Sequence, residues 1–235
     1  AHGDVIMVGA FITYTICSTA GLSPVLGVVV SIIVCTLLGV LIEKVAYRPL
    51  RKASSPLAVL ITAIGVSYLL QNVALLIFGA NAKAFTSVVP VAPVKLANGQ
   101  INITGETIVT ILSCLVIMAG LMLFINKTKA GQAMLAVSED KGAAQLMGIN
   151  VDGTIALTFA IGSALAAVAG VLLCSAYPSL TPYTGSMPGI KAFVAAVFGG
   201  IGSIPGAFIG GILLGIIEIF GKAYISSQMA DAIVF

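Results

Sequence analysis

Charged side chains are scarce in this sequence. Lysine, arginine, aspartate and glutamate make up 8% of the 235 residues, whereas 59% of the residues are hydrophobic. A soluble domain carries charge at about a quarter of its positions, because it needs a surface that water can wet. The mean hydropathy is +1.16. The composition therefore excludes an ordinary soluble domain and indicates a chain that has lipid as its solvent.

The groups that enzymes use for catalysis are also rare. His2 is the only histidine, and no HExxH, GxSxG or Walker motif is present. The apolar stretches contain no paired carboxylates, and beyond Glu43 and Glu218, near the ends of two stretches, they contain few ionisable groups. We therefore expect no catalytic residue, no metal site and no ATPase site in this chain. A porter driven by protons or sodium is also disfavoured.

The cysteines do not indicate a metal site or a disulfide framework, and the net charge does not indicate a nucleic acid as a partner. The cysteines lie in apolar stretches without CxxC spacing, which is typical of small packing residues: Cys17, Cys35, Cys114 and Cys174. The net charge is only +3 and is carried by loops. This pattern fits orientation in a membrane rather than binding of nucleic acid.

The long apolar stretches predict an all-α, polytopic membrane helix bundle, since each span needs roughly 20 apolar residues and must satisfy its own backbone. The predicted spans are residues 5–20, 24–42, 57–78, 107–125 and 155–176. Two shorter pieces follow, 192–201 and 206–220, and predict a broken or re-entrant helix pair near the C-terminus. Both ends of the chain lie beside apolar runs, so we expect the sequence to be truncated at both ends.

The charges of the loops predict which side of the membrane each loop occupies. Residues 43–55 contain four basic side chains in one short loop, which the positive-inside rule places in the cytoplasm. Alternation then places 79–106 outside, 126–154 in the cytoplasm and 177–190 outside.

The loop 126–154 is a polar island in an apolar chain. Its central part predicts a helix over 138–147, with Ser138 as the N-cap, acidic residues in the first turn and Gly148 as the stop. A short helix between two spans can transmit force from a soluble partner, or it can be a solvated connection. Its spacing alone leaves both interpretations open.

Polar side chains also form stripes within two predicted spans. At 100° per residue, Thr62, Tyr68 and Asn72 fall within one arc, with Ser67 and Gln71 on the opposite side. In the first span, three polar or small side chains share a face: Tyr14, Cys17 and Ser18. Either stripe can line a solute path or make hydrogen bonds between helices. We choose Thr62, Tyr68 and Asn72 as candidate solute contacts, and expect no full protein charge to be required there.

The predicted helix pair also brings two charges to the same depth. Lys191 precedes the turn by roughly as many residues as Glu218 follows it, so a hairpin places them side by side. Pairing lessens the cost of a charge inside the bilayer, whereas snorkelling to water is the alternative. We expect an ion pair between Lys191 and Glu218.

The polar island resembles a known element. Ala143, Ala144 and Gly148, followed by Ile155 and Leu157, resemble the cytoplasmic EAA-type loop of ABC importer permeases, which docks in a cleft of the ATPase subunit. Gly142 stands where that motif has its glutamate, and Thr158 where it often has proline. The resemblance implies that 126–154 is a coupling loop, with contacts from Ser138, Glu139, Asp140, Lys141, Ala143, Ala144 and Gly148.

A wider resemblance covers nearly the whole chain. The runs AHGD, EKVAYRPLR, SEDKGAAQLMGIN and KAF, and the later run GGIGSIPG, are similar to those of the bacterial high-affinity branched-chain amino acid permease family. The resemblance implies a single transmembrane permease domain over 1–235 in the bacterial inner membrane. It also implies a second related permease, two ATPase subunits that bind ATP, a periplasmic binding protein and an amino acid as solute. A secondary transporter or channel that acts without an ATPase is the alternative.

Overall fold

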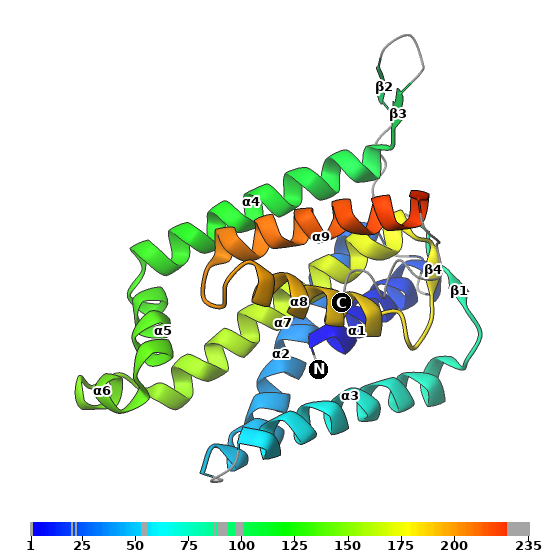
Figure 1. Cartoon of the computed structure of the whole chain (residues 1–235). Helices are drawn as coiled ribbons and strands as arrows, with labels where there is room; N and C mark the ends of the chain where they lie inside the picture. Colours follow the sequence, from blue (N-terminus) through cyan, green and yellow to red (C-terminus); the bar gives the residue numbers. More distant parts are fainter. Residues whose placement is uncertain are drawn as a thin grey trace.

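The computed structural model describes residues 2–19, 21, 23–52, 56–86, 88, 94–96 and 101–224 and is built almost entirely of helices (Figure 1). The long helices are α2 (Pro24–Ile42), α3 (Pro56–Phe78), α4 (Gly105–Lys127), α7 (Val151–Ala176) and α9 (Ile204–Tyr224). The shorter ones are α1 (His2–Tyr14), α5 (Lys129–Glu139), α6 (Lys141–Leu146) and α8 (Ser186–Phe198). The expected all-α membrane bundle is confirmed.

Five helices in the described part of the chain are long and apolar enough to cross a membrane. They are Pro24–Tyr47, Leu57–Phe78, Gly105–Lys127, Val151–Ala176 and Ile204–Tyr224. The first of these joins α2 to a π-helical segment, Glu43–Tyr47, which is followed by a 3₁₀ turn, Pro49–Lys52. The first expected span, 5–20, instead consists of α1 and a π-helical segment, Thr15–Thr19.

The core of the bundle is the packing of α1 against α2 and α7. Seven of the 13 residues of α1 are buried, although the helix is too short to be counted among the candidate spans. Two hydroxyl groups connect α1 to α2: Ser31 Oγ of α2 donates to Gly9 O of α1 at 2.8 Å, and Thr13 Oγ1 of α1 lies 3.4 Å from Gly27 O of α2 while it also donates to Gly9 O of its own helix at 3.1 Å. Hydrogen bonds of this kind hold helices together where apolar burial provides little net drive.

The C-terminal pair consists of one short helix and one complete span. α8 has 13 residues, so at 1.5 Å per residue it is about 20 Å long and shorter than a bilayer core. α9 has 21 residues and is longer than the predicted piece 206–220. Pro205 stands in the first turn, where a missing N–H costs nothing, and Ser203 Oγ accepts from Gly206 N at 3.1 Å. The helix also continues past the apolar residues as far as Tyr224.

Loops that were predicted to share a side of the membrane meet in the structure. β1 (Lys83–Ala84) pairs with β4 (Ser179–Leu180), which joins the two loops predicted outside, and β2 (Val94–Leu96) pairs with β3 (Ile101–Ile103) within the first of them. α5 and α6 lie at the other end of the molecule from β1 and β4 (Figure 1). The predicted grouping of the loops is thus present.

The crossing of α1 and α7 generates the first prediction. A Cβ at Gly170 would collide with the main chain of Ile6, whereas a Cβ at Gly120 on α4 would meet nothing. We expect Gly170→Ala to destabilise the folded chain by about 2 kcal/mol, because overpacking against backbone cannot relax by a change of rotamer. Gly120→Ala should be neutral or stabilising by up to about 1 kcal/mol. Unfolding of the purified chain in detergent measures both, and equal effects would contradict the assigned crossing.

Candidate functional site

The polar island 126–154 folds into two helices rather than one. α5 ends at Glu139, and Asp140 takes an extended conformation before α6 begins. The Asp140 carboxylate accepts hydrogen bonds from the N–H groups of Gly142 at 2.7 Å and Ala143 at 3.1 Å, so Asp140 is the N-cap. The predicted N-cap, Ser138, lies within α5 and donates its hydroxyl to Leu135 O. The predicted start at Ser138 is therefore wrong, because the acid two residues later caps the helix instead.

The predicted stop at Gly148 is confirmed by its geometry. Gly148 has a φ of +81°, a conformation that favours glycine. Its N–H donates to Gln145 O, and the N–H of Ile149 donates to Ala144 O, both at 3.0 Å. This pair of bonds is the Schellman arrangement that closes a helix. α6 is thus closed at both ends by its own residues.

The side chains of α6 face two ways. Ala144 is buried, whereas Ala143, Lys141, Glu139 and Asp140 of the same segment are exposed. The two apolar side chains at the end of the helix are almost fully exposed, Leu146 at 90% and Met147 at 82%. Because α5–α6 is a polar segment at one end of the bundle, lipid does not account for these two side chains. An exposed apolar tip of this kind is typical of a surface that docks a partner.

An ion cluster lies beside this segment, between residues more than 100 positions apart. Arg48 Nη2 lies 2.8 Å from Asp152 Oδ2, and Arg51 contacts both Asp152 and Glu43. The Glu43 side chain is 1% exposed, and its Oε2 has no hydrogen-bond partner among the described residues. Asp152 is in the first turn of α7, so the cluster ties the end of the first long span to the start of α7. The sequence showed these residues only as loop charges.

A cavity lined by both polar and apolar side chains lies between α1, α3 and the start of α8. Its volume is about 690 Å³. From α3 it is lined by Ile64, Ser67, Tyr68 and Gln71, and from the other elements by His2, Gly3, Asp4, Tyr183, Gly185, Ser186, Gly189, Ile190 and Phe193. Ser67 and Gln71, which the helical arc had placed opposite Tyr68, therefore share the cavity with it.

Of the three candidate solute contacts, Tyr68 alone is among the residues that line this cavity. Thr62 Oγ1 donates to Ala58 O at 2.9 Å, and Asn72 Nδ2 donates to Tyr68 O at 2.7 Å. Both polar groups thus bond to carbonyls of their own helix. A helical arc shows which residues share a face, but not which face meets the cavity.

Asp4 is a further polar residue of the cavity that the sequence did not single out. It is 4% exposed, and Gln71 Nε2 donates to its Oδ1 at 2.7 Å. Asp4 and Gln71 are 67 positions apart, so no local pattern could have connected them.

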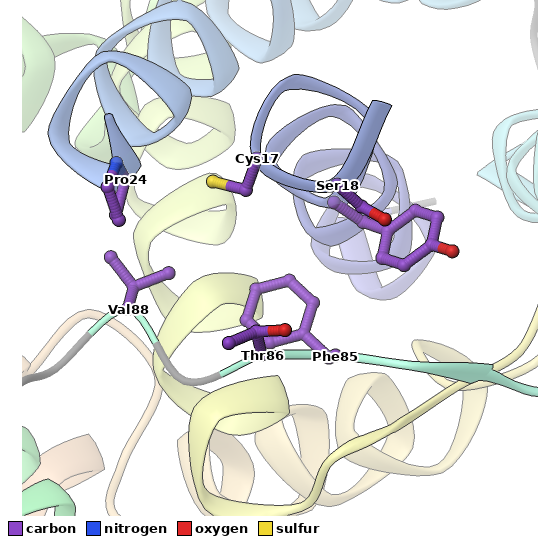
Figure 2. A pocket seen from close by; sticks show the side chains of 7 residues that line it. Cys17, Ser18, Pro24, Phe85, Thr86 and Val88 are labelled. Atoms are coloured by element: carbon purple, nitrogen blue, oxygen red, sulfur yellow. The ribbon is translucent and has the colours of Figure 1, made fainter. Parts of the chain in front are cut away.

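A second cavity, of about 200 Å³, lies at the end of the bundle that carries β1 and β4. Tyr14, Cys17 and Ser18, the stripe of the first predicted span, line it together with Pro24. The extended segment that carries Phe85, Thr86 and Val88 lies across from Cys17 and Ser18 (Figure 2). The stripe thus faces a small external hollow rather than the larger cavity.

The structure brings Lys191 and Glu218 together, as expected. Lys191 Nζ lies 2.9 Å from Glu218 Oε2. Lys222, one turn further along α9, contacts the other oxygen of the same carboxylate. Glu218 therefore has two cationic partners, of which the sequence predicted one.

These features define a polytopic α-helical membrane protein with cavities between its helices that a few polar side chains help to line, and with a charged helical segment at one end. The family model for the permease component of the branched-chain amino acid transport system matches residues 1–235. The chain belongs to this family.

Curated relatives match over the whole chain. The high-affinity branched-chain amino acid transport system permease protein BraD of Pseudomonas aeruginosa is 44% identical over 246 residues, which cover 100% of this chain and 80% of the relative. LivH of Escherichia coli K12, described in the same words, is 42% identical over 254 residues, 100% of this chain and 79% of the relative. A probable branched-chain amino acid permease of Methanocaldococcus jannaschii is 30% identical, over 97% of this chain and 72% of the relative. No solved structure matches the chain.

The ion cluster generates the second prediction. Arg51→Met leaves the buried Glu43 carboxylate without its cationic partner, so we expect a loss of about 3–5 kcal/mol of stability. Arg48→Met removes a pair in which both side chains are about half exposed, and should cost no more than about 1 kcal/mol. Denaturation of the purified variants measures both values. Glu43→Gln in the Arg51→Met background should restore part of the loss, and equal costs for the two arginines would rule out the assigned difference.

The charges around Glu218 generate the third prediction. Lys191→Met and Lys222→Met should each cost little, because either lysine leaves the carboxylate paired. The double variant should lose more than the sum of the two, by about 0.5–1 kcal/mol. The control combines Lys191→Met with Lys127→Met at the distant end of α4, a combination that should be additive. Additive losses for Lys191 and Lys222 would show that the two lysines do not compensate for each other at Glu218.

Proposed function

We propose that this chain is the membrane-spanning permease subunit of a binding-protein-dependent ABC importer for branched-chain or related small amino acids. The observation that carries the proposal is the α5–α6 segment, a capped helix with an exposed apolar tip. Family membership over the full chain and the described transport function of the relatives support it. In this proposal, residues 126–154 are the cytoplasmic coupling loop.

The proposal includes partners that supply what this chain lacks. ATP is bound and hydrolysed by two ATPase subunits, and the chain itself holds no cofactor. A second homologous permease completes the path through the bacterial inner membrane, and a periplasmic binding protein delivers the solute. No nucleic acid takes part. The absence of a Walker motif from the sequence is consistent with this division of labour.

A force applied to α6 can be transmitted to the rest of the bundle through a short series of contacts. Ala144 is buried within α6, and only residues 147–149 separate α6 from the N-cap of α7, where Asn150 Oδ1 accepts from Gly153 N at 3.0 Å. Asp152 in the next turn is held by Arg48 and Arg51. A displacement of α6 therefore acts on α7 and, through the ion cluster, on the end of α2. Since α1 packs on both helices, the motion reaches the large cavity.

The large cavity is the proposed solute path through this subunit. Tyr68 remains the proposed contact from the original stripe, and Ser67 and Gln71 join it. Thr62 and Asn72 lie on the same helix, and we keep them as candidates of second rank because both groups bond to their own backbone. Unchanged uptake by the alanine variants of Tyr68, Ser67 and Gln71, each with normal insertion, would remove α3 from the path.

The exposed tip of α6 generates the fourth prediction. We expect Leu146→Asp combined with Met147→Asp to reduce uptake about tenfold or more while the chain still inserts and folds. The reason is that two apolar contacts are replaced by charges that a docked partner would have to desolvate. The measurement is ATP-dependent uptake of leucine by vesicles that contain the complete transporter, together with ATP hydrolysis by the same vesicles.

The control, Gln132→Asp, adds one such charge at an exposed polar position of α5, outside the helix proposed to dock, and should transport normally. Normal uptake by the double variant would contradict docking through α6. Uptake of leucine by wild-type vesicles without ATP or the ATPase subunits would favour a channel or secondary transporter instead.

A further inference from the structure

α4 is the least buried of the candidate spans, and a cavity follows one side of it. None of the residues in its most apolar window is buried, although α4 contacts both α7 and α9 (Figure 1). A cavity of about 280 Å³ lies between these three helices. α4 therefore lies beside its neighbours without filling the space between them.

This cavity is lined by apolar side chains. They are Cys114, Ile117, Met118 and Leu121 from α4, Leu165, Val168, Ala169 and Leu172 from α7, and Ile204 and Phe208 from α9. No charged, hydroxyl or amide side chain is among the described residues that line it. An unfilled space of this kind loses dispersion contacts on all its walls, and inside a bilayer the apolar material at hand is lipid hydrocarbon. The walls and the place of the cavity within the spans thus favour an acyl chain as its occupant.

A second cavity, of about 290 Å³, continues the first toward the end of α4. It lies where α4, α5 and the turn between α8 and α9 meet, and Ile204 lines both cavities. Asn126 of α4 and Ser203 of the turn bring an amide and a hydroxyl group to its wall, beside Met122, Ile125 and Leu135. The lining thus changes from apolar to partly polar toward the ends of the helices, as the parts of a phospholipid do.

The residues that α4 contributes to the two cavities form one stripe. They are residues 114, 117, 118, 121, 122, 125 and 126, which recur at the helical spacing of three and four and so share a face. From Cys114 to Asn126 the chain advances about 18 Å at helical rise, and one leaflet contributes roughly 15 Å to the hydrocarbon core. The two cavities together therefore cover the depth of a single leaflet and the start of its headgroup layer.

The charges at this end of α4 favour an anionic headgroup. Lys127 is the last residue of α4 and Lys129 the first of α5, and both side chains are exposed. Neither aspartate nor glutamate is among the described residues that line the two cavities. The positive-inside rule predicts this end to be cytoplasmic, and basic residues beside a span on that side attract anionic lipids.

We propose that an anionic phospholipid of the cytoplasmic leaflet binds between α4, α7 and α9. One acyl chain occupies the apolar cavity, and the phosphate lies at the end of the second cavity near Asn126 and Ser203, in the field of Lys127 and Lys129. The lipid completes the packing of α4 and connects α5 to the turn between α8 and α9. The inference goes beyond the proposed function and does not depend on how transport is driven.

The experiment uses the absence of tryptophan from the sequence. Phe208→Trp places one reporter in the wall of the apolar cavity, and Phe220→Trp places one on an exposed part of the same helix. Each full-length variant is inserted in vesicles of equal parts phosphatidylglycerol and phosphatidylcholine, one of which carries brominated chains that quench tryptophan on contact. At Phe208→Trp we expect the anionic lipid to be preferred about fivefold or more, from attraction to basic side chains. At Phe220→Trp the two lipids should quench equally.

The headgroup is tested in the Phe208→Trp chain. Lys127→Gln combined with Lys129→Gln should abolish the preference for phosphatidylglycerol. The matched control is Lys44→Gln combined with Lys141→Gln, which removes two exposed lysines from loops predicted on the same side, and it should keep the preference. A preference that survives the loss of Lys127 and Lys129 would contradict the assigned headgroup position.

The acyl chain is tested by filling its cavity. Ala169→Phe projects a ring into the space between α4 and α7, so quenching of Phe208→Trp by both brominated lipids should fall and the preference should disappear. Val116→Phe, on the exposed opposite side of α4, is the control for size and should change neither. Thermal melting of both variants checks that they are folded.

Three further results would overturn the proposal. Equal quenching by the two lipids at Phe208→Trp would show that the cavity holds no selected lipid. Quenching by neither lipid would show that protein, such as a second permease copy, fills the space. Relief of quenching by added leucine would assign the cavity to the solute. Each result leaves the importer assignment untouched, because that assignment is tested by ATP-dependent uptake.

Discussion

The close packing of α1 on α2 and α7 is the constraint on which the rest of the structure depends. Water contributes no hydrophobic drive between helices in lipid, so contact requires small residues and internal hydrogen bonds. Gly9 supplies both, because its carbonyl accepts from Ser31 and Thr13 and its small size admits Ala167 of α7. The cavity that holds Asp4, the cluster at Glu43 and the base of α6 are all built outward from these three helices.

The two ion pairs of the cluster beside α7, Arg48–Asp152 and Arg51–Glu43, contribute differently to stability. Arg48 and Asp152 are about half exposed, so their attraction is weak but links segments more than 100 residues apart. Glu43 is buried, and Arg51 offsets a desolvation cost that would otherwise be large. The end of α2 thus makes a weak, solvent-exposed ion pair with α7 and a strong, buried ion pair within its own segment. The exposed pair therefore links the end of α2 to α7 without attaching the two helices rigidly to each other.

Much of the helix content could be predicted from apolar stretches alone. The predicted span 24–42 has the same bounds as α2, because Pro24 can start a helix but cannot continue one. Counting residues from the predicted turn also placed Lys191 beside Glu218, because a hairpin brings residues that are equally far from its turn to the same depth. The length of α9 was underestimated because its last turn carries Lys222, and Ser138 was preferred to Asp140 because both residue types can cap a helix.

Contacts between distant residues could not be predicted. Nothing local connects Asp4 to Gln71 or Arg51 to Asp152, and the arc of α3 could not say whether Tyr68 or Gln71 faces inward. A single sequence gives the faces of a helix but not the neighbours that cover them. The polar sites of this chain depend on those neighbours, so their geometry needed the structure.

The uneven burial of the long helices has a mechanical meaning. In the most apolar window of α7 a third of the residues are buried, whereas none are buried in α4 and 11% in α3. α1, α2 and α7 thus pack together as the core, and α3 and α4 lie outside it with few contacts to it (Figure 1). In the proposed coupling, a push on α6 displaces these three tightly packed helices together, and the sparse contacts to α3 and α4 are the ones that change. Such a displacement would change the width of the cavity beside α3 while the packing of α1, α2 and α7 stays intact.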